Sequence, residues 1–418
     1  MESSSNNNNK NNINENNNIN QNNNNNLSNN NTSSLINNGA PLIKGIKIRN
    51  YMTKDKDIFS KICRLPHDIN LNTLKAYSIC YDYSIRRSMA QNGYIYVAED
   101  KDGTNVMGGI CVLEKKLRLG GKEKIFFYPF DAIVEPKFRS YRILQRLTDY
   151  ATNLYMEHSD YDPIIYTSTS VVNTRMDKFY NNTAMVKIID QVQHAWKVDI
   201  KLQPSQFCYD SRFKIWKERD DEIVKKKLNQ YFKDYEMCPV EFDDLLLNKF
   251  WKYTYFAQWT QGDKVYEASI SIWDQNKVCT LIDLEKKENT KLKFFQIFGC
   301  YTSGNPENVK IDIFQELLKH VHNDCYHNGI DFLFIGLSKT DPIDKYFPLL
   351  SGIKSLNFAL HFCVGNTETK EEALALSNNP FFQDPRDYGI VLLHQSSPSD
   401  EGNENQSSLI YNPISSKL

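Results

Sequence analysis

The sequence predicts an α/β fold of the α+β kind, with two tandem mixed-sheet domains, helices on both faces and a degenerate second copy. In residues 43–200, several strand patterns are followed by alternating helix and strand patterns, which is typical of a sheet covered by helices. The same order recurs in residues 201–395 with weaker motifs. A chain of 418 residues has room for two domains of ordinary size.

Low-complexity segments flank these two domains. Residues 1–42 are dominated by asparagine with some serine, and residues 396–418 by serine, proline, asparagine and glutamate. Neither segment can bury enough apolar surface to offset its ordering entropy, so both are predicted to be disordered. An assembly role for the asparagine-rich tail is the alternative, and an inert extension is the simpler interpretation.

The bulk composition excludes several classes of protein. Basic and acidic residues are balanced at 50 against 51, so no global field favours nucleic acid or a membrane surface. The N-terminus has no basic region followed by an apolar one, and no apolar run is long enough to span a membrane. The nine cysteines are dispersed without a C-x-x-C pair, which is typical of reduced thiols. We therefore expect a soluble cytoplasmic protein, with a nuclear location possible.

The first domain is predicted from its hydrophobic periodicity. Strands are expected at 46–48, 94–98, 106–113 and 125–134, and mixed helical patterns at 71–91. A helix beginning at Ile143 places apolar residues at i, i+3, i+4 and i+7, namely Leu147, Tyr150, Ala151 and Leu154. Strands at 164–166 and 185–198 complete this domain.

The second domain follows a connector at 198–210. A lysine-rich helix is expected at 222–235, and strands at 253–259, 265–273, 278–284 and 292–298. After a Gly304-Asn305-Pro306 loop, a helix is expected at 309–327, with strands at 332–335, 358–364 and 388–393.

Two motifs of the first domain point to chemistry. Val134-Glu135-Pro136-Lys137-Phe138-Arg139 joins a strand to a helix, and such a turn offers unpaired N–H groups and a positive dipole end to a pyrophosphate. The second motif, after the next strand, runs from Asn173 through Met176 and Phe179-Tyr180 to Ala184-Met185. Together the motifs resemble the acyl-CoA-binding half of the GCN5-related N-acetyltransferases.

This resemblance implies acetyl-CoA as co-substrate, no metal, and a set of binding residues. Ala132, Ile133 and Val134 would face the thioester and pantetheine, with strand-like pairing to the pantetheine amides. Asn173 would contact the cofactor arm. The pyrophosphate would face the turn, whose residues are Arg139, Ser140, Tyr141, Arg142, Ile143 and Leu144. Arg142 and Leu144 stand where the family pattern has small residues.

The resemblance also assigns the proton transfers. The Tyr180 hydroxyl would protonate the leaving thiolate, since a phenol is a donor at neutral pH. A base must take the proton from the amine, and Asp131 and Glu135 flank the central strand as candidates. Asp131 precedes a bulge-prone part of that strand, so its side chain could reach the substrate side. Glu135 fits a solvated loop residue better.

The ordered length also resembles the plant HOOKLESS1-type N-acetyltransferases. The landmarks lie in the second domain: Ala268-Ser269-Ile270-Ser271-Ile272-Trp273, the Gly304 loop with its helix, Asp341-Pro342, and Asp384-Pro385-Arg386-Asp387-Tyr388. Members of that family pair an acetyltransferase domain with a related C-terminal domain and have regulatory roles.

Two functions follow from these patterns. The first is an acyl-CoA-dependent N-acetyltransferase acting on an unidentified amine, in a protein or a small molecule. The second is a non-catalytic binding or scaffold protein of the same fold, which the missing loop glycines favour. No metal site is expected, because His320 and His322 point about 200° apart on a helix.

Overall fold

The computed structural model describes residues 45–62, 65–67, 76–79, 82–158, 164–170, 174–181, 185–283, 290–349, 355–365 and 374–387. The two predicted tails, the strand predicted at 388–393 and Asn173 lie outside the described residues. A 13-stranded mixed sheet has the order β1-β4-β5-β6-β7-β17-β8-β16-β15-β12-β11-β9, with β10 paired to β5. A smaller sheet has the order β14-β13-β3-β2.

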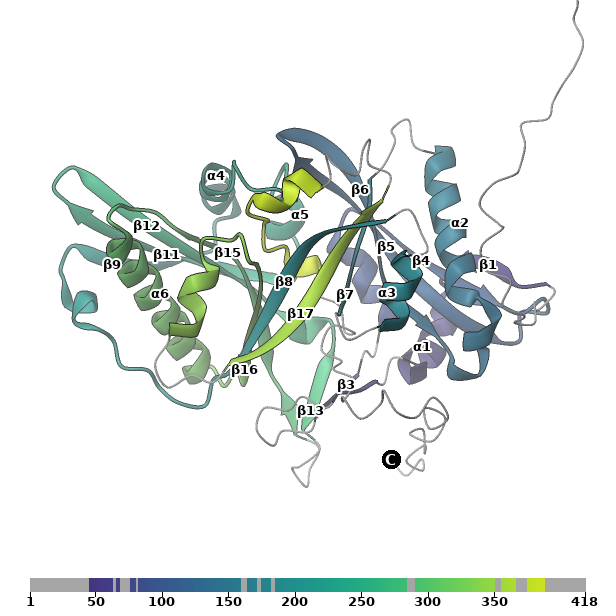
Figure 1. The fold of residues 1–418 in the computed structure, drawn as a ribbon. Coiled ribbons are helices and arrows are strands. Elements are labelled where there is room, and N and C mark those ends of the chain that lie inside the picture. Colours follow the sequence, from purple (N-terminus) through teal and green to yellow (C-terminus); the bar gives the residue numbers. More distant parts are fainter. Residues whose placement is uncertain are drawn as a thin grey trace, which may run out of the picture. The chain divides into compact units, whose positions relative to one another are not determined.

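The first half of the large sheet follows the predicted order of elements (Figure 1). Its strands are β1 (Lys47–Asn50), β4 (Asn92–Glu99), β5 (Val106–Leu119), β6 (Lys122–Val134), β7 (Ile164–Ser170) and β8 (Val186–Lys197). Its helices are α1 (Lys56–Ile62), α2 (Ile143–His158) and α3 (Thr174–Asn181), with 3-10 helices η2 (Tyr83–Met89) and η3 (Pro136–Tyr141). The strands β2 (Leu65–His67) and β3 (Ala76–Ile79) come from the same half of the chain but belong to the smaller sheet.

The second half repeats this order. Its strands are β9 (Phe213–Glu218), β10 (Cys238–Pro239), β11 (Trp251–Gln261), β12 (Lys264–Trp273), β13 (Thr280–Asp283), β14 (Lys291–Leu292), β15 (Phe294–Thr302), β16 (Phe332–Ser338) and β17 (Ser355–Gly365). Its helices are α4 (Asp221–Tyr231), α5 (Asp243–Leu246) and α6 (Glu307–His327), with 3-10 helices η6 (Asp344–Leu349) and η8 (Pro385–Asp387).

The two halves exchange their last strands. In each half the fourth strand of an antiparallel run pairs in parallel with the strand that follows a long helix, β6 with β7 and β15 with β16. The last strand of the first half, β8, pairs with β16, while the last strand of the second half, β17, pairs with β7. These two strands also pair with each other. The sheet is therefore continuous, and the predicted boundary between residues 200 and 201 remains a prediction.

Three apolar clusters pack on the large sheet. In the second half, two of these clusters lie on opposite faces of the sheet. Successive residues of β11 show this, since Tyr255 packs on the side of α6 and Phe256 on the side of α4. On the first half, Leu147 and Ala151 of α2 cover one face, as the helical spacing predicts. The opposite face shares one apolar cluster with α4 and with Phe381 and Phe382. Helices thus lie on both faces, which confirms the predicted arrangement.

One segment differs from its prediction. The mixed helical pattern at 71–91 corresponds to strand β3 and the 3-10 helix η2, with residues between them outside the described ranges. Strand β3 pairs with β13 of the second half, so a long-range partner decides its conformation. Local helical propensity is a weak signal against such pairing.

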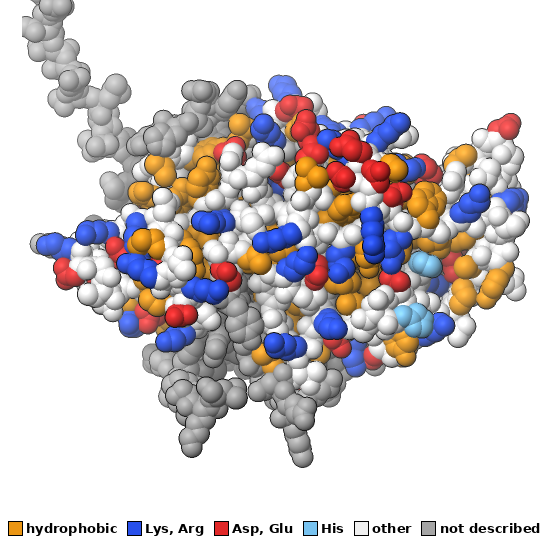
Figure 2. Space-filling view, turned by 180° about the vertical axis from the view of Figure 1, so that it is seen from behind, with side chains coloured by type: hydrophobic (Ala, Val, Ile, Leu, Met, Phe, Trp, Pro, Cys, Tyr) orange, Lys and Arg blue, Asp and Glu red, His pale blue; other side chains and the backbone are white. Residues whose placement is uncertain are grey.

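The charged side chains of the visible surface are mixed in sign, in agreement with the balanced composition. Figure 2 shows basic and acidic side chains interspersed over the face opposite to that of Figure 1. Within the described residues, no helix combines the length and apolar character that crossing a bilayer needs.

Candidate functional site

The strands β6 and β7 separate where the cofactor site was predicted. They pair in parallel at Phe126 with Ile164 and at Phe127 with Ile165. Beyond these pairs no further ladder pair joins β6 to β7 in the described residues, while β6 continues along β5 and β7 along β17. We call the region past the last pair, formed by 128–134 of β6 and 166–170 of β7, the first splay. Backbone groups without a ladder partner can pair with an amide-containing ligand.

A β-bulge lies on β6 within the first splay. Gly109 pairs with Ile133 and Cys111 with Phe130, so Asp131 and Ala132 together oppose one residue of β5. Asp131 has φ 47°, a left-handed conformation that aspartate tolerates better than most residues. A bulge takes backbone groups out of the regular ladder and re-aims them. A bulge is thus present, but it consists of Asp131 and Ala132 and is followed by Ile133 and Val134, whereas the sequence placed Asp131 before it.

The predicted pyrophosphate turn directly follows the bulged strand. Residues 136–141 form η3, Arg142 has φ 56° and ψ 31°, and α2 then begins at Ile143. The Arg146 N–H donates to the Arg142 carbonyl at 3.1 Å, so the N–H groups of 143–145 precede this helical hydrogen bond. The backbone at Arg142 is therefore in the left-handed region, which glycine adopts more readily than arginine. The Ile143 side chain is buried, and those of Arg142 and Leu144 are half-buried.

Replacing Arg142 by glycine should stabilise the protein. A left-handed residue other than glycine costs roughly 1–2 kcal/mol, and the greater freedom of glycine in the unfolded chain offsets part of that gain. We expect a net increase of about 0.5–1 kcal/mol in the free energy of unfolding, measured in urea. Leu144→Gly, two residues further inside α2, is the control and should destabilise by about 1 kcal/mol. A loss of stability in Arg142→Gly equal to that of the control would contradict the conformational argument.

Asp131 is held by the 3-10 helix η2, which packs on the face of the sheet opposite α2. Its carboxylate lies 2.7 Å from Arg86 Nε, and both side chains are buried. The Arg86 guanidinium also lies 4.6 Å from the Phe130 ring centre. Tyr83 donates a hydrogen bond of 2.5 Å to the Asp131 carbonyl. Two residues of η2 therefore fix the bulge and orient the predicted base.

Tyr180 and Glu135, the other residues predicted for proton transfer, lie in different surroundings. Tyr180 is buried on α3, with its hydroxyl 3.1 Å from Thr167 Oγ1. Thr167 in turn donates to the Pro129 carbonyl at 3.1 Å, so these groups connect α3, β7 and β6 across the first splay. Glu135, by contrast, is partly exposed and pairs with Lys137 at 3.1 Å. The structure thus brings Tyr180 to the splay and leaves Glu135 at its rim.

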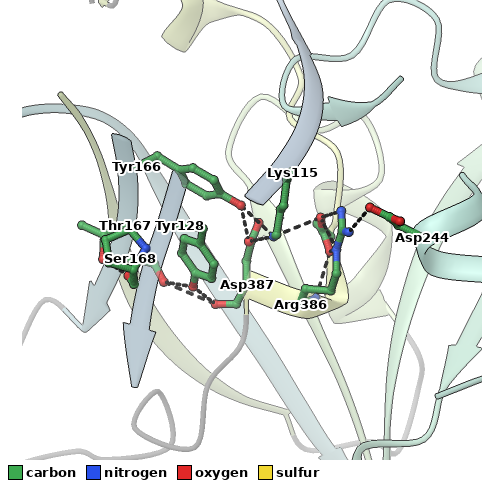
Figure 3. A network of polar contacts seen from close by, with 10 residues as sticks. Lys115, Tyr128, Tyr166, Thr167, Ser168, Asp244, Arg386 and Asp387 are labelled. Carbon is green, nitrogen blue, oxygen red and sulfur yellow. Dashed lines mark hydrogen bonds and ion pairs between the residues drawn. The ribbon is translucent and has the colours of Figure 1, made fainter. Parts of the chain in front are cut away.

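A buried charge network lies on the face of the sheet opposite α2. Figure 3 shows the polar contacts among its residues. Lys115 Nζ lies 2.5 Å from Asp387 Oδ1 and 3.2 Å from Asp384 Oδ2, and it donates to the Tyr166 hydroxyl at 2.7 Å. Arg386 binds both carboxylate oxygens of Asp384. The segment 381–387 is therefore tied to β5 by buried ion pairs, and to β7 by the hydrogen bond that the Tyr166 hydroxyl donates to Asp387.

The same network reaches the first splay. Tyr128 of β6 donates a 2.8 Å hydrogen bond to the Asp387 carbonyl, and Ser168 of β7 donates one of 3.3 Å. Tyr128 and Ser168 lie just beyond the last β6–β7 pairs. Asp387 thus lies at the first splay, on the side away from α2.

Burial governs the ionisation of this network. Removal from water lowers the pKa of Lys115 and raises that of Asp387. Burial also acts to raise the pKa of Asp384, yet Arg386 and Lys115 outweigh it and hold that pKa below its usual value. Asp384 is therefore the fixed anion of the network. Sequence reasoning noted 384–388 only as a landmark and missed Lys115. Its position in phase with the apolar Leu113 and Leu117 of β5 was the available signal that its side chain points inward.

The second half contains a matching bulge and splay. Ser269 pairs with Tyr301 and Ser271 with Phe298, so Gly299 and Cys300 oppose one residue of β12, with Gly299 at φ 58°. Strands β15 and β16 pair at 294–296 with 332–334, after which no further pairs join them in the described residues. Here the Cys300 N–H donates to Gln383 Oε1 at 2.9 Å, and Gln383 Nε2 donates to Asp341.

Asp341 gives this region a pH dependence. Burial raises its pKa to about 7, against the hydrogen bonds from Ile343 and Gln383 that favour the carboxylate. Between the unfolded pKa of 3.8 and about 7, the folded state holds a proton that the unfolded state has lost. The contribution of Asp341 to stability should therefore be greatest at low pH and fall by up to roughly 1.4 kcal/mol per pH unit across that window.

The measurement is the urea midpoint at pH 5 and at pH 8 for wild type and Asp341→Asn. We expect the difference between the two pH values to shrink in the variant, because the titrating group is gone. An unchanged difference would assign the pH dependence to other groups.

Comparisons with known proteins place the fold. No family model and no curated protein matches the sequence. A Saccharomyces cerevisiae N-myristoyltransferase with bound myristoyl-CoA is similar at TM-score 0.55 and 10% identity, covering 85% of each chain. A GCN5-related N-acetyltransferase from Sphaerobacter thermophilus has TM-score 0.51 and 9% identity, covering 78% of this chain and 96% of that one. The chain thus has the fold of the GCN5-related N-acetyltransferases, which confirms the predicted fold class.

Proposed function

We propose that the chain is an acyl-CoA-dependent N-acyltransferase whose site is the first splay, with acetyl-CoA as donor and an amine as acceptor. One observation carries this proposal: a bulged strand end, a strand separation and the N-terminus of a long helix meet at 131–144. The bound myristoyl-CoA of the yeast structure shows that a protein of this fold accepts an acyl-CoA. The landmark motifs that resemble those of HOOKLESS1-type proteins are our reason for proposing an acetyl group.

Each part of this site has a task in the proposal. The Ala132 N–H at the bulge would polarise the thioester carbonyl, and 132–134 would pair with the pantetheine amides. The N–H groups of the turn from Arg139 to Leu144 would receive the pyrophosphate at the positive end of α2. Asn173, outside the described residues, stays a candidate for contact with the cofactor arm.

The transfer itself forms one bond and breaks another. The amine nitrogen attacks the acyl carbon, the carbon–sulfur bond breaks, and the thiolate takes the Tyr180 proton. Asp131 stays our candidate for accepting the proton of the amine, with Arg86 fixing its carboxylate beside the bulge. Holding both reactants in register would supply much of the acceleration.

A non-catalytic binding protein is the second candidate. The observation that favours it is the pair of larger side chains, Arg142 and Leu144, at the turn where the family pattern has small residues. Such a protein would keep the fold without turning over acetyl-CoA.

Thiol release from acetyl-CoA separates these two functions. We expect release above background with at least one amine from a panel of peptide N-termini, lysine side chains, polyamines and aminosugars, together with the acetylated product by mass spectrometry. Binding of acetyl-CoA without release in the presence of the whole panel would favour the binding protein.

A further inference from the structure

The two bulges can be matched residue by residue. Their flanking pairs place Phe130 with Phe298 and Ile133 with Tyr301, so Asp131 corresponds to Gly299 and Ala132 to Cys300. Both first bulge residues have positive φ, 47° and 58°. The Cys300 N–H is therefore the counterpart of the Ala132 N–H that the proposed function assigns to the thioester carbonyl.

In the second half, the Cys300 N–H is hydrogen-bonded to a side chain of the same protein, Gln383. The side-chain carbonyl of Gln383 accepts the Cys300 N–H at 2.9 Å, and the Gln383 side chain is fully buried. Its amide nitrogen donates to the buried carboxyl of Asp341. A carbonyl oxygen supplied by the chain thus sits where the proposed site would place the oxygen of an acyl group.

The helix of the second half begins with an acidic residue. Glu307 is the first residue of α6, the counterpart of Ile143 at the start of α2. Its carboxylate accepts from the Tyr346 hydroxyl at 2.7 Å and pairs with Lys345. A carboxylate at this end satisfies the helix dipole and repels a pyrophosphate.

We infer that the second half is a docking site for the chain's own segment Phe381–Asp387, with Gln383 filling the acyl-carbonyl position. This inference rests on the proposed function for the meaning of that position. The second half therefore binds no acyl-CoA. Its role is to anchor the segment so that Asp387, four residues after Gln383, reaches the first splay at Tyr128 and Ser168.

Other contacts agree with a firmly docked segment. Phe382 packs on Phe298 beside the second bulge, with ring centres 6.4 Å apart, and on Phe232 at 5.0 Å. The Phe382 N–H donates to the Glu236 carbonyl at 3.0 Å. Gln383 is thus a positioning residue, held by apolar packing and by two polar partners.

Hydrogen exchange read by mass spectrometry tests this inference on the full chain. In the wild type, we expect slow exchange at the Cys300 amide, and added CoA should protect 132–144 while 299–309 keep their rates. Fast exchange at Cys300, or protection of 299–309 by CoA, would overturn the inference. Absence of any CoA effect would contradict the proposed function alone, since the Cys300 rate decides the docking separately.

A substitution of Gln383 gives a second test of the inference. Gln383→Met keeps the side-chain length and removes both hydrogen bonds, so exchange at 299–301 and 381–387 should rise about tenfold or more by local opening. Asn379→Ala, which removes a bond to Glu236 at the start of the same stretch, is the control and should leave the Cys300 amide unchanged. Unchanged exchange at Cys300 in Gln383→Met would overturn the inference.

Discussion

Replacing Lys115 by methionine should destabilise the protein by about 3–5 kcal/mol, because two buried carboxylates lose their shared cation. Methionine has nearly the length of lysine, so packing is conserved while Asp384 and Asp387 keep only Arg386 and hydroxyl partners. The free energy of unfolding in urea measures the effect.

Lys116→Met is the matched control for this prediction. The neighbouring side chain is exposed, and its removal should change stability by less than about 0.5 kcal/mol. Equal effects of the two substitutions would show that the Lys115 network contributes no specific stabilisation.

Replacing Tyr180 by phenylalanine should lower turnover about 10²–10⁴-fold, the usual contribution of a positioned general acid. The affinity for acetyl-CoA should stay nearly unchanged, because the pyrophosphate and pantetheine contacts that we propose lie on β6 and at the start of α2. The turnover number comes from thiol release with the amine identified in the panel, and the affinity from calorimetry.

Thr167→Val is the control for the tyrosine. It removes the hydrogen-bond partner of the phenol and keeps the phenol itself, so its turnover should fall less. A parallel loss of turnover and of acetyl-CoA affinity in Tyr180→Phe would reject the role as acid and indicate a packing role.

Much of the fold was predictable because its signals are local. The spacing of Leu147 and Ala151 fixes the covered face of α2, and Pro136 with Arg139 marks the turn before it. The left-handed conformation of Arg142 could not be predicted from the sequence, because arginine rarely adopts a positive φ. Only the surrounding turn imposes it.

The remaining features depend on long-range partners. The exchange of β8 and β17 joins strands about 170 residues apart, and neither strand pattern encodes its neighbour. Lys115 and Asp387 meet across a longer gap of 272 residues, and a lysine in a strand ordinarily faces water. The docking of Gln383 on Cys300 has the same origin, because one amide side chain carries no sequence signal of its partner.

Calorimetric titration with acetyl-CoA tests the account most directly. We predict micromolar binding to the wild type, weakened by Arg142→Asp, which places a carboxylate in the phosphate turn, and unchanged by Lys122→Asp at the other end of β6. Failure to bind at millimolar acetyl-CoA, or equal weakening by both substitutions, would contradict a cofactor site at the first splay.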